Sequence, residues 1–511
     1  MASPSQRLQF PKLRMRITMK STIRRVACLG ILGFCFSGLV GCGSSTSPKT
    51  TNTAASATSA VQVNADGSIT RTAVSENAIT TFSEAIKSAK SNPAMAIDLF
   101  KKAAKEDSNF AEAWYNVGLL EQERGNTKEA MEAYETTLKM RPDMASAYTN
   151  IARLQIAEGK FDEAITTLNK VIDDKTGIDP FNVEANLNMG MIYRHRGEAI
   201  LERDSGGVEK QFSMSGSENK GEIKNKEAYD LFAQAVVYIR RALVGDSNNI
   251  YCYENLSAIY YLMNSLEVAR LVTTQAKLKY DEYNNALKEK LDAGRITPEE
   301  YEIKVYQPKD LAAIYNTSGL IYLAEGEVSL GNAEFKQAVA LDPDSVPAML
   351  NVAGIAVNVQ DYPLALEQYE KVLTLEPNNI EAYLSKAVAL RGLDRLDEAE
   401  KIYRDIISKH PEYPQAQFNL NVLYQEYYQK TDEARAMWAA FVENPQAQKI
   451  IPGRVEEAKT RIKQIDEAKA AAEKAAADAA RMQAEMEELE RMAREAEAAE
   501  AAEAAQSGDG N

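Results

Sequence analysis

The side chains that most often bind metals or act as nucleophiles are scarce in this sequence. It contains two histidines and four cysteines, which are His195, His410, Cys28, Cys35, Cys42 and Cys252. A structural zinc site draws its four ligands mainly from these residue types, so the composition argues strongly against one. The sequence also has no GxxxxGK[ST] phosphate loop, HExxH, CxxC, GxSxG or EF-hand loop. We therefore expect no enzyme activity, no cofactor, no metal and no small-molecule substrate.

The remaining candidate side chains are predicted to have structural roles. Adjacent carboxylates such as Asp173–Asp174 and Glu487–Glu488 are abundant. We interpret them as solvated helix faces, because catalytic carboxylates need an enclosing apolar pocket. His195 lies near the end of a predicted helix, where we expect a surface or turn contact. Cys252 is predicted to be a small buried hydrophobic residue.

The first 41 residues have the composition of a secretory signal. Residues 7–25 carry seven Lys or Arg and no Asp or Glu, and an apolar run follows from Val26 to Phe36. Even counted through Val40, this run has 15 residues, fewer than the roughly 20 that a membrane-spanning helix needs. We predict a signal peptide over residues 1–41. Three methionines are candidates for the start of translation, namely Met1, Met15 and Met19.

The signal ends in Leu39-Val40-Gly41-Cys42, which resembles the lipobox of bacterial lipoproteins. The resemblance implies cleavage before Cys42 and acylation of its thiol and new amine by fatty acids such as palmitate, which anchors a protein stably in a bilayer. In that family Asp after the cysteine retains the protein in the inner membrane, and here the residue is Gly43. The resemblance therefore implies an outer-membrane anchor facing the periplasm. The alternative is an ordinary signal with a chance cysteine.

The net charge excludes two classes of partner. The whole chain has a formal charge of −15, and without residues 1–41 its 52 Lys and Arg stand against 74 Asp and Glu, a net charge of −22. Nucleic acids need clustered cations on the protein surface. Anionic lipid surfaces attract basic segments in the same way. We therefore expect no nucleic acid partner and no membrane binding through charge alone.

Between residues 76 and 453 the sequence repeats itself. Residues 111–142 and 380–411 carry small, aromatic and proline residues at the same spacing, including Tyr134 and Tyr403 at equivalent places. This pattern resembles the tetratricopeptide repeat, a 34-residue helix–turn–helix unit. The resemblance implies an all-α fold, a right-handed solenoid of about nine repeats. We place the first residues of these repeats at 77, 111, 145, 183, 250, 312, 346, 380 and 414.

Recurring residues within the repeats are predicted to have packing roles. Small residues at positions 8 and 20 let two helices approach closely, and large residues at position 24 fill the space between units. Proline at position 32 ends the second helix. Glycine after the first helix favours a turn, and the glycines concerned are Gly125, Gly159, Gly197 and Gly326. We interpret the recurrent asparagine at position 6 as making a structural hydrogen bond.

Two insertions lengthen the repeat array. Residues near 198–227 are rich in Gly and Ser, which predicts an exposed loop. Residues 280–310 are predicted to form a helical hairpin, in which one helix ends at Gly294 and the next is capped by Thr297 with Glu300 at the third helical position. The hairpin is either a tolerated surface insertion or an arm that docks a partner.

The segments that flank the repeats are predicted to be simpler. Residues 42–75 are the acylated cysteine and a tether rich in Ser, Thr, Ala and Asn, with too few apolar groups to order. Residues 454–505 are predicted to form a capping helix followed by an exposed Ala/Glu-rich helix. Residues 506–511 are predicted to be disordered.

In tetratricopeptide proteins the first helix of each repeat lines a concave groove, which positions 2, 5, 9 and 12 face, and we base the prediction on positions 5 and 9. Toward the C-terminus these positions are largely apolar here, unlike the chaperone-binding subclass, whose groove uses Lys, Asn and Arg. We predict an apolar groove for a protein partner. The alternative is that the insertions or the C-terminal helix cover it. The predicted groove residues are Tyr115, Leu119, Leu187, Met191, Leu320, Leu350, Leu384, Val388, Phe418 and Val422.

The overall plan combines a lipobox, a tether, many repeats and an Ala/Glu-rich tail. It resembles the tetratricopeptide lipoproteins of myxobacterial gliding motility in architecture, without a diagnostic motif. The resemblance implies a scaffold that binds proteins of an envelope complex and helps to assemble an envelope-spanning machine. Two alternatives stay open: a pilotin-like assembly factor for a pilus or secretion channel, and an accessory factor of glycan or polysaccharide processing.

Overall fold

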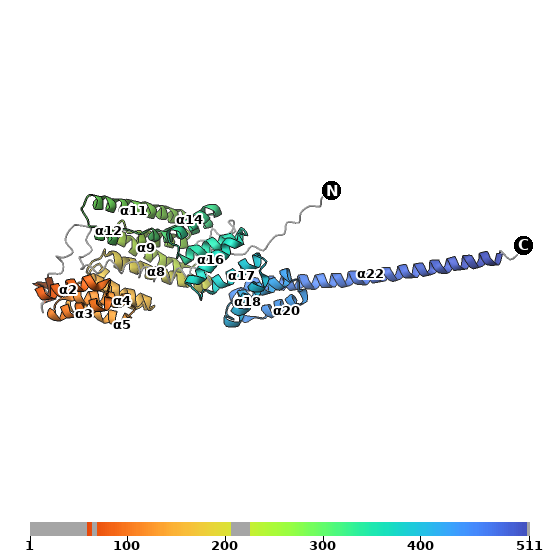
Figure 1. Cartoon of the computed structure of the whole chain (residues 1–511), viewed down its shortest axis with the longest axis horizontal. Coiled ribbons are helices and arrows are strands. Elements are labelled where there is room, and N and C mark those ends of the chain that lie inside the picture. The colour runs from red at the N-terminus through yellow and green to blue at the C-terminus, as the bar shows by residue number, and fades with distance from the viewer. Residues whose placement is uncertain (1–58, 64–68, 206–224, 508–511) are drawn as a thin grey trace. The chain divides into compact units, whose positions relative to one another are not determined.

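The computed structural model describes residues 59–63, 69–205 and 225–507, which group into two units. One unit ends at Asp361 and also holds Thr374–Pro377, and the other consists of Tyr362–Leu373 and the chain from Asn378 onward. Figure 1 shows that both are built from adjacent helices. The first unit contains α2 (Glu76–Ala89), α3 (Pro93–Glu106), α4 (Ala111–Glu123), α5 (Thr127–Met140), α6 (Ala145–Ala157), α7 (Phe161–Ile172), α8 (Val183–Ser205), α9 (Lys226–Gly245), α10 (Ile250–Leu262), α11 (Leu266–Asp292), α12 (Pro298–Lys304), a 3-10 turn η3 (Pro308–Leu311), α13 (Ala312–Ala324), α14 (Val328–Leu341) and α15 (Val346–Asn358).

The second unit begins with α16 (Tyr362–Leu375), so the division falls inside the seventh repeat. Its other elements are α17 (Ile380–Gly392), α18 (Leu396–Lys409), α19 (Pro414–Val422), a π-helical turn η4 (Leu423–Tyr427), α20 (Thr431–Val442), α21 (Pro445–Ile450) and α22 (Pro452–Ser507). Eight of the nine predicted repeats begin at the first residue of a helix, and the first repeat begins one residue inside α2. The predicted all-α repeat solenoid is confirmed.

Close packing between paired helices explains the small residues at position 8. A Cβ atom added at Gly118 of α4 would lie 2.5 Å from the Tyr134 ring of α5, and one added at Gly319 would lie 2.5 Å from the Phe335 ring. Both rings are fully buried. An alanine at either glycine would therefore overpack the helix pair.

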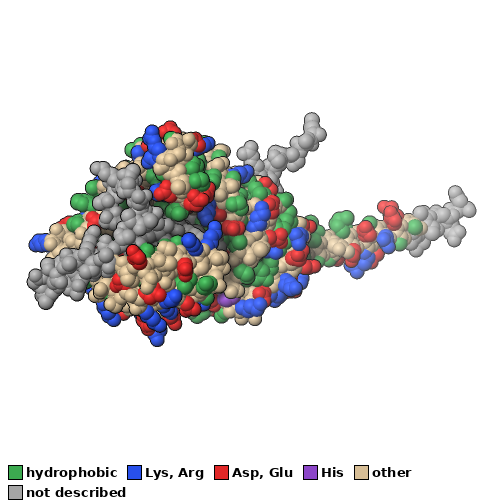
Figure 2. Space-filling model, turned by 60° about the vertical axis from the view of Figure 1, so that its left-hand side comes forward, with side chains coloured by type: hydrophobic (Ala, Val, Ile, Leu, Met, Phe, Trp, Pro, Cys, Tyr) green, Lys and Arg blue, Asp and Glu red, His purple; other side chains and the backbone are tan. Residues whose placement is uncertain are grey.

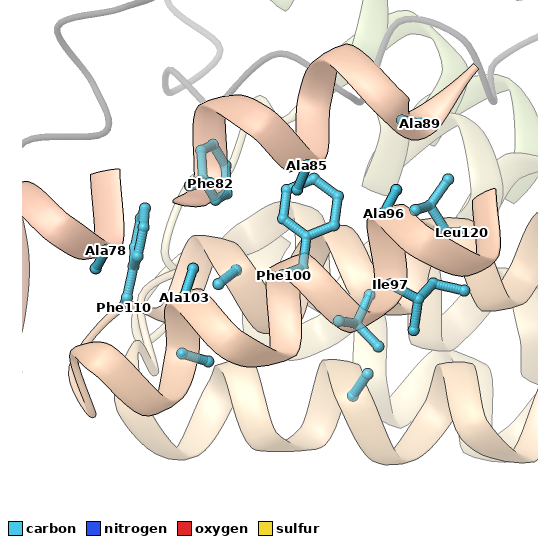
Figure 3. Packing of buried hydrophobic residues seen from close by; sticks show 14 of the residues in the cluster. Ala78, Phe82, Ala85, Ala89, Ala96, Ile97, Phe100, Ala103, Phe110 and Leu120 are labelled. Atoms are coloured by element: carbon cyan, nitrogen blue, oxygen red, sulfur yellow. The ribbon is translucent and has the colours of Figure 1, made fainter. Parts of the chain in front are cut away.

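The N-terminal pairs share one continuous core, which Figure 3 shows between α2, α3 and α4. Phe82 lies between two other rings, 5.0 Å from Phe100 and 4.7 Å from Phe110 between centroids. Alanines such as Ala85 and Ala103 fill the remaining contacts and are fully buried. Alternating large and small side chains in this way lets the helices interdigitate without voids.

The turn after the first helix needs a left-handed residue at position 15. Glycine supplies it at Gly125, Gly159 and Gly326, with φ between 76° and 89°. Other repeats use a polar residue at the same place, such as Asn264 or Asp394, with φ near 60°, which these short side chains tolerate.

The prediction that Gly197 makes such a turn is wrong. Gly197 lies inside α8, which runs on to Ser205. A Cβ atom there would lie 2.6 Å from the ring of Phe232 in α9. This glycine therefore provides space for a neighbouring aromatic side chain rather than freedom for the backbone.

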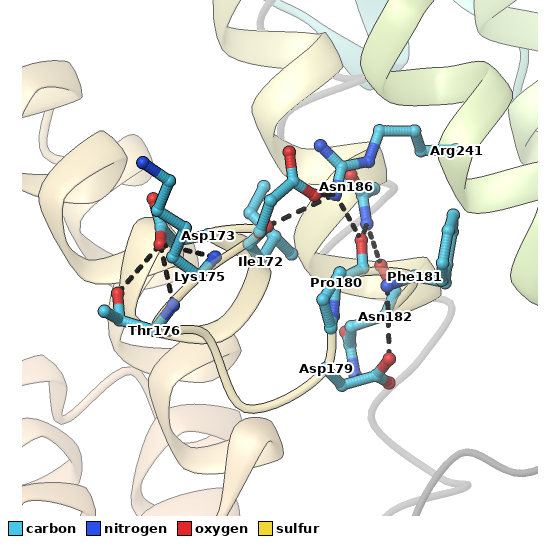
Figure 4. A network of polar contacts seen from close by, with 11 residues as sticks. Ile172, Asp173, Lys175, Thr176, Asp179, Pro180, Phe181, Asn182, Asn186 and Arg241 are labelled. Atoms are coloured by element: carbon cyan, nitrogen blue, oxygen red, sulfur yellow. Dashed lines mark hydrogen bonds and ion pairs between the residues drawn. The ribbon is translucent and has the colours of Figure 1, made fainter.

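The connection between α7 and α8 is held by one arginine from α9. Arg241 donates from Nη2 to the carbonyl oxygens of Ile172 and Pro180, at 3.3 and 3.0 Å, and pairs with Asp174 at 2.6 Å. Figure 4 shows that these contacts bind the two ends of the loop to one guanidinium. Within the loop, the Asp173 carboxylate accepts from the backbone of Lys175 and Thr176. Polar contacts thus order the connection between α7 and α8.

The predicted helical hairpin of 280–310 is present. Gly294 has φ of 62° after α11, and Thr297 and Glu300 form a reciprocal capping box at the start of α12. The returning chain is fixed to α11, since Asn284 both donates to and accepts from the backbone of Tyr306, at 2.8 and 3.0 Å. Of the other insertion, α8 takes up residues to Ser205, and residues 206–224 lie outside the described part of the chain.

The ninth repeat has one extra residue, which the chain absorbs as the π-helical turn η4. The Tyr428 amide donates to the Leu423 carbonyl, five residues back, at 3.1 Å. The left-handed residue of the following turn is Gln429, at position 16 instead of 15. The rest of the repeat keeps its packing, because Trp438 and Phe441 of α20 are fully buried.

The C-terminal region is one helix, α22, rather than the predicted capping helix followed by a second helix. Its first turns bury Val455, Ala458 and Ile465, and its residues from 466 to 501 are exposed. Figure 2 shows this far part as a rod with acidic, basic and apolar side chains intermixed. The helix includes Gln506 and Ser507, which the sequence predicted as disordered, and 508–511 lie outside the described residues. An Ala/Glu-rich sequence of high helix propensity explains why it continues without tertiary support.

The tether prediction for 42–75 needs one correction. Ser59–Val63 (β1) and Ile69–Ala73 (β2) pair as an antiparallel hairpin, with Val63 opposite Ile69. Alternating β-branched residues on either side of an Asp-Gly pair are a hairpin signal, and the composition argument overlooked it. The signal peptide and Cys42 lie outside the described residues.

Candidate partner-binding groove

The ten predicted groove residues lie closer to the core than the sequence suggests. Seven of them have only 5–8% of their surface exposed, and these are Tyr115, Leu119, Leu320, Leu384, Val388, Phe418 and Val422. The remaining three, Leu187, Met191 and Leu350, are half-buried. The first seven therefore contribute mainly to packing, and their role in partner binding stays a prediction.

Contacts with neighbouring helices explain this burial. The Tyr115 ring lies 5.7 Å from the Tyr134 ring of the same repeat, and its hydroxyl accepts from Asn150 of the next repeat at 3.0 Å. The Phe418 ring lies 5.1 Å from Trp438. Helical spacing places positions 5 and 9 on the right face, but it does not reveal how closely the next repeat covers that face.

The asparagines at position 6 make the predicted structural hydrogen bonds in four repeats. Asn116 and Asn255 donate to the backbone carbonyl four residues earlier, at 2.7 and 2.9 Å. Asn150 and Asn351 donate to a side chain of the preceding repeat, at 3.0 and 2.9 Å. The same position therefore stabilises either the helix itself or the contact between repeats.

The groove face is polar around repeats four and five. Arg194 of α8 donates from Nε to Glu198 at 2.9 Å and from Nη1 to Asn255 at 3.0 Å, and all three side chains are buried. Burial raises the pKa of the nearby Glu254 carboxyl to about 7, the Arg194 charge opposes that rise, and the Asp310 charge adds to it. In this part of the molecule the guanidinium is thus paired with the Glu198 carboxylate and lies near the partly protonated Glu254 carboxyl.

Comparison with known families identifies the repeat. Models of the tetratricopeptide repeat match residues 78–145, 119–187 and 356–420. The chain carries tetratricopeptide repeats.

Individual proteins that resemble this chain match only part of it, and the chain spans about a third of the length of the first of these relatives. A chloroplastic tetratricopeptide protein of Arabidopsis thaliana, PYG7, is 34% identical over 20% of this chain and 31% of its own length. The photosystem I assembly protein Ycf3 of Prochlorococcus marinus is 28% identical over 26% of this chain and 69% of its own length. Among solved structures, the type IV pilus biogenesis factor PilW aligns with a TM-score of 0.36 and 16% identity, covering 54% of this chain and 97% of that one.

Cys252 and His195, two residues of types that often act in catalysis, pack against other side chains of the repeats. Cys252 is fully buried, and burial raises the pKa of its thiol, as expected for a small core residue. The His195 ring lies 4.9 Å from the Phe161 ring. The described residues contain no group of three or more His, Cys, Asp and Glu that could hold a metal ion.

One polar groove position went unnoticed in the sequence. Position 12 of the first helix holds Arg194 in repeat four and Arg391 in repeat eight, and both guanidinium groups are buried. A charged residue at a predicted groove position, one helical turn from Val388, is the signal that could have revealed Arg391. Within the described residues no helix is long and apolar enough to cross a bilayer.

Proposed function

We propose that the protein is a lipid-anchored periplasmic scaffold whose tetratricopeptide repeats bind protein partners and help to assemble an envelope-spanning machine. The observation that carries this proposal is the repeat array itself, nine helix pairs between residues 76 and 442. Stacked helix pairs present long, helix-lined surfaces for other proteins. An assembly role also has support from Ycf3, a relative that is itself named as an assembly protein.

The anchor part of the proposal rests on the lipobox-like Leu39–Cys42 sequence. Cys42→Ser removes the thiol that would be acylated, so the variant should remain uncleaved or be released as a periplasmic protein. Labelling cells with radioactive palmitate measures this directly. Equal incorporation by wild type and variant would refute the anchor.

We expect the partners to be proteins of the cell envelope. The gliding-motility machinery is the first candidate, because its tetratricopeptide lipoproteins have the same order of lipobox, tether, repeats and Ala/Glu-rich tail. Chemical crosslinking in intact cells, followed by purification and mass spectrometry, should recover a reproducible set of envelope proteins. The Cys42→Ser variant is the matched control, because it keeps the repeats and lacks the cysteine that would be acylated. If wild type and control recover the same soluble proteins, the scaffold does not act at the outer membrane.

A further inference from the structure

Arg391 at the end of α17 is a buried cation that has no anion beside it in the described part of the chain. Only 8% of its surface is exposed, and its Nη1 atom is buried without a hydrogen-bond partner. Across the described residues it forms no ion pair, and its guanidinium carbon lies 5.4 Å from the centroid of the Tyr427 ring. A guanidinium does not lose its proton in a protein, so the charge is present and costly to bury.

Other poorly exposed arginines show how the chain usually neutralises such a charge. Arg141 pairs with Glu112 at 2.6 Å, and Arg194 pairs with Glu198 at 2.9 Å. Arg461 is the most informative, because it also stacks on an aromatic ring, Trp438, at 5.4 Å, and yet binds two carboxylates at 2.7 and 3.0 Å. Stacking alone is therefore not the usual way in which this protein accommodates a buried arginine.

A second unpartnered donor lies close to Arg391. The Tyr403 hydroxyl is fully buried and has no hydrogen-bond partner. Burial raises the pKa of Tyr403 to about 12, and the nearby Arg391 charge opposes that rise. The hydroxyl is therefore a proton donor at neutral pH, and among the described residues neither it nor Arg391 Nη1 has a hydrogen-bond acceptor. A carboxylate, with two oxygens that accept several hydrogen bonds, has the complementary chemistry.

Apolar side chains on the same helix face as Arg391 indicate that a bound ligand also has apolar groups. Leu384, Val388 and Arg391 follow one another at intervals of four and three residues in α17, which places them on one helix face. Phe418 and Val422 hold the equivalent positions 5 and 9 of the next repeat, in α19, where the Arg454 guanidinium carbon lies 4.7 Å from the Phe418 ring centroid. Each of these four apolar side chains retains 6–8% exposure. A ligand that reaches Arg391 along this face therefore meets hydrocarbon first and the charge at its end.

The π-helical turn places the ring of Tyr427 against the Arg391 guanidinium. Tyr427 is the last residue of η4 and has 38% of its surface exposed, and within the described residues its hydroxyl makes no hydrogen bond. The neighbouring Tyr424 and Tyr428 hydroxyls, in contrast, are both bonded to Glu400, at 2.8 and 2.9 Å. π-Turns arise from a single inserted residue and occur frequently at functional sites. The Tyr427 ring therefore lies against the guanidinium at this turn, and its hydroxyl is not fixed by a hydrogen bond within the described residues.

We infer that Arg391, together with the Tyr403 hydroxyl and the Tyr427 ring, recognises an acidic side chain in an apolar segment of a protein partner. This inference rests on the proposed binding function and adds the chemistry of the bound segment. The site lies at position 12 of the eighth repeat and at an inserted π-turn. Charge complementarity selects the carboxylate, and Leu384, Val388, Phe418 and Val422 select its apolar neighbours.

A displayed library of random peptides, selected on the full-length protein, tests the inference. The recovered peptides should be enriched in Asp or Glu next to Leu, Met or Phe, and their binding should weaken as salt rises. Arg391→Met keeps most of the side-chain volume and removes the charge, so we expect ten- to a hundredfold weaker binding, in the range of a lost charged hydrogen bond, with an unchanged or higher melting temperature. Arg391→Lys should bind only partly, because an ammonium lacks the planar fork of donors.

Arg461→Met is the matched control, because Arg461 stacks on a ring but already binds carboxylates of the chain. It should lower the melting temperature and leave peptide binding unchanged. Two results would overturn the inference: selected peptides without acidic residues that bind wild type and Arg391→Met alike, or peptide binding that Arg461→Met and Arg391→Met weaken equally. Either result leaves the proposed scaffold function intact, because crosslinking in the envelope measures that function separately.

Discussion

Repeats four and eight carry a buried arginine at the same helix position, but only the arginine of repeat four is paired with a carboxylate. Arg194 is bonded to Glu198 and to Asn255. Arg391 has no carboxylate partner among the described residues, and no bond joins it to Asn419, the equivalent of Asn255. Both side chains are buried to a similar degree. Equivalent positions in a repeat array can therefore hold either a structural charge or an unneutralised one.

The length of the first helix explains the difference. In repeat four α8 continues past Gly197 to Ser205, so Glu198 lies one turn beyond Arg194 on the same face. In repeat eight α17 ends at Gly392, and the residue four places after Arg391 is Arg395, which pairs with Glu398 at the start of α18. A helix that ends early thus removes the position from which a carboxylate could neutralise the arginine. The insertion in repeat four has a direct electrostatic consequence.

The largest expected effect comes from making repeat four resemble repeat eight. Glu198→Ala leaves the buried Arg194 without its carboxylate, which should lower the free energy of unfolding by about 3–5 kcal/mol. Trp114 lies in the first unit and Trp438 in the second, so single-tryptophan variants let denaturant titrations report on each unit. The loss should appear only with the Trp114 probe.

The control for this change is Glu398→Ala, which removes the partner of the exposed Arg395. Surface ion pairs contribute less than about 1 kcal/mol, so the Trp438 transition should move little. If Glu198→Ala proves as mild as this control, Arg194 does not depend on its carboxylate, and the contrast between the two repeats disappears.

A smaller effect is expected from pH, again in one region only. Glu254 occupies position 5 of repeat five, and its pKa is raised to about 7 by burial. The folded state therefore holds a proton that the unfolded state releases near pH 4.3. Stability of the first unit should fall by about 1–3 kcal/mol as pH rises from 4.5 to 7 and then level off.

Glu254→Gln should abolish that slope, measured as the Trp114 transition at a series of pH values. The equivalent position in repeat eight is Leu384, which cannot titrate, so the Trp438 transition should lack this component. A slope that survives Glu254→Gln would assign the proton to another group, with Asp310 the first candidate, because burial raises its pKa as well.

Much of the fold could be predicted because the repeat fixes local structure. The first residues of the helices follow from small, bulky and proline positions, each of which has a packing reason, as Gly118 against Tyr134 illustrates. The capping box at Thr297 is equally local. Gly197 was misjudged because its role depends on Phe232, which is 35 residues away in the sequence.

The site was less predictable for the same physical reason. Periodicity places Leu384 and Val388 on the correct face of α17, but the degree to which neighbouring repeats cover them depends on three-dimensional packing. The charge of Arg391 is visible in the sequence, whereas the lack of a carboxylate near it is not. The extra residue of repeat nine was recognisable, but its consequence, a π-turn that brings Tyr427 over Arg391, required the structure.

The smallest expected effect tests whether Arg391 presents a free charge. Val388 lies one turn before Arg391 on the same face of α17, so Val388→Glu supplies from the chain itself the carboxylate that we assign to a partner. Both Val388→Glu and Val388→Gln lose apolar burial, and their side chains have nearly the same size. At pH 7 the Glu variant should be the more stable by about 1 kcal/mol, because its charge pairs with Arg391.

The pH dependence of this pair of variants gives the sign of the interaction. Pairing with a cation lowers the pKa of the introduced carboxyl in the folded state. The higher stability of Val388→Glu relative to Val388→Gln should therefore be fully present above about pH 4.3 and should be lost as pH falls through the lower folded-state pKa. The Val388→Glu variant should also bind selected acidic peptides more weakly than the Val388→Gln variant does, because the site already holds a carboxylate. If the Glu variant is instead the less stable of the two at pH 7, burial of the new carboxylate outweighs any attraction, and Arg391 does not offer an unneutralised charge to a partner.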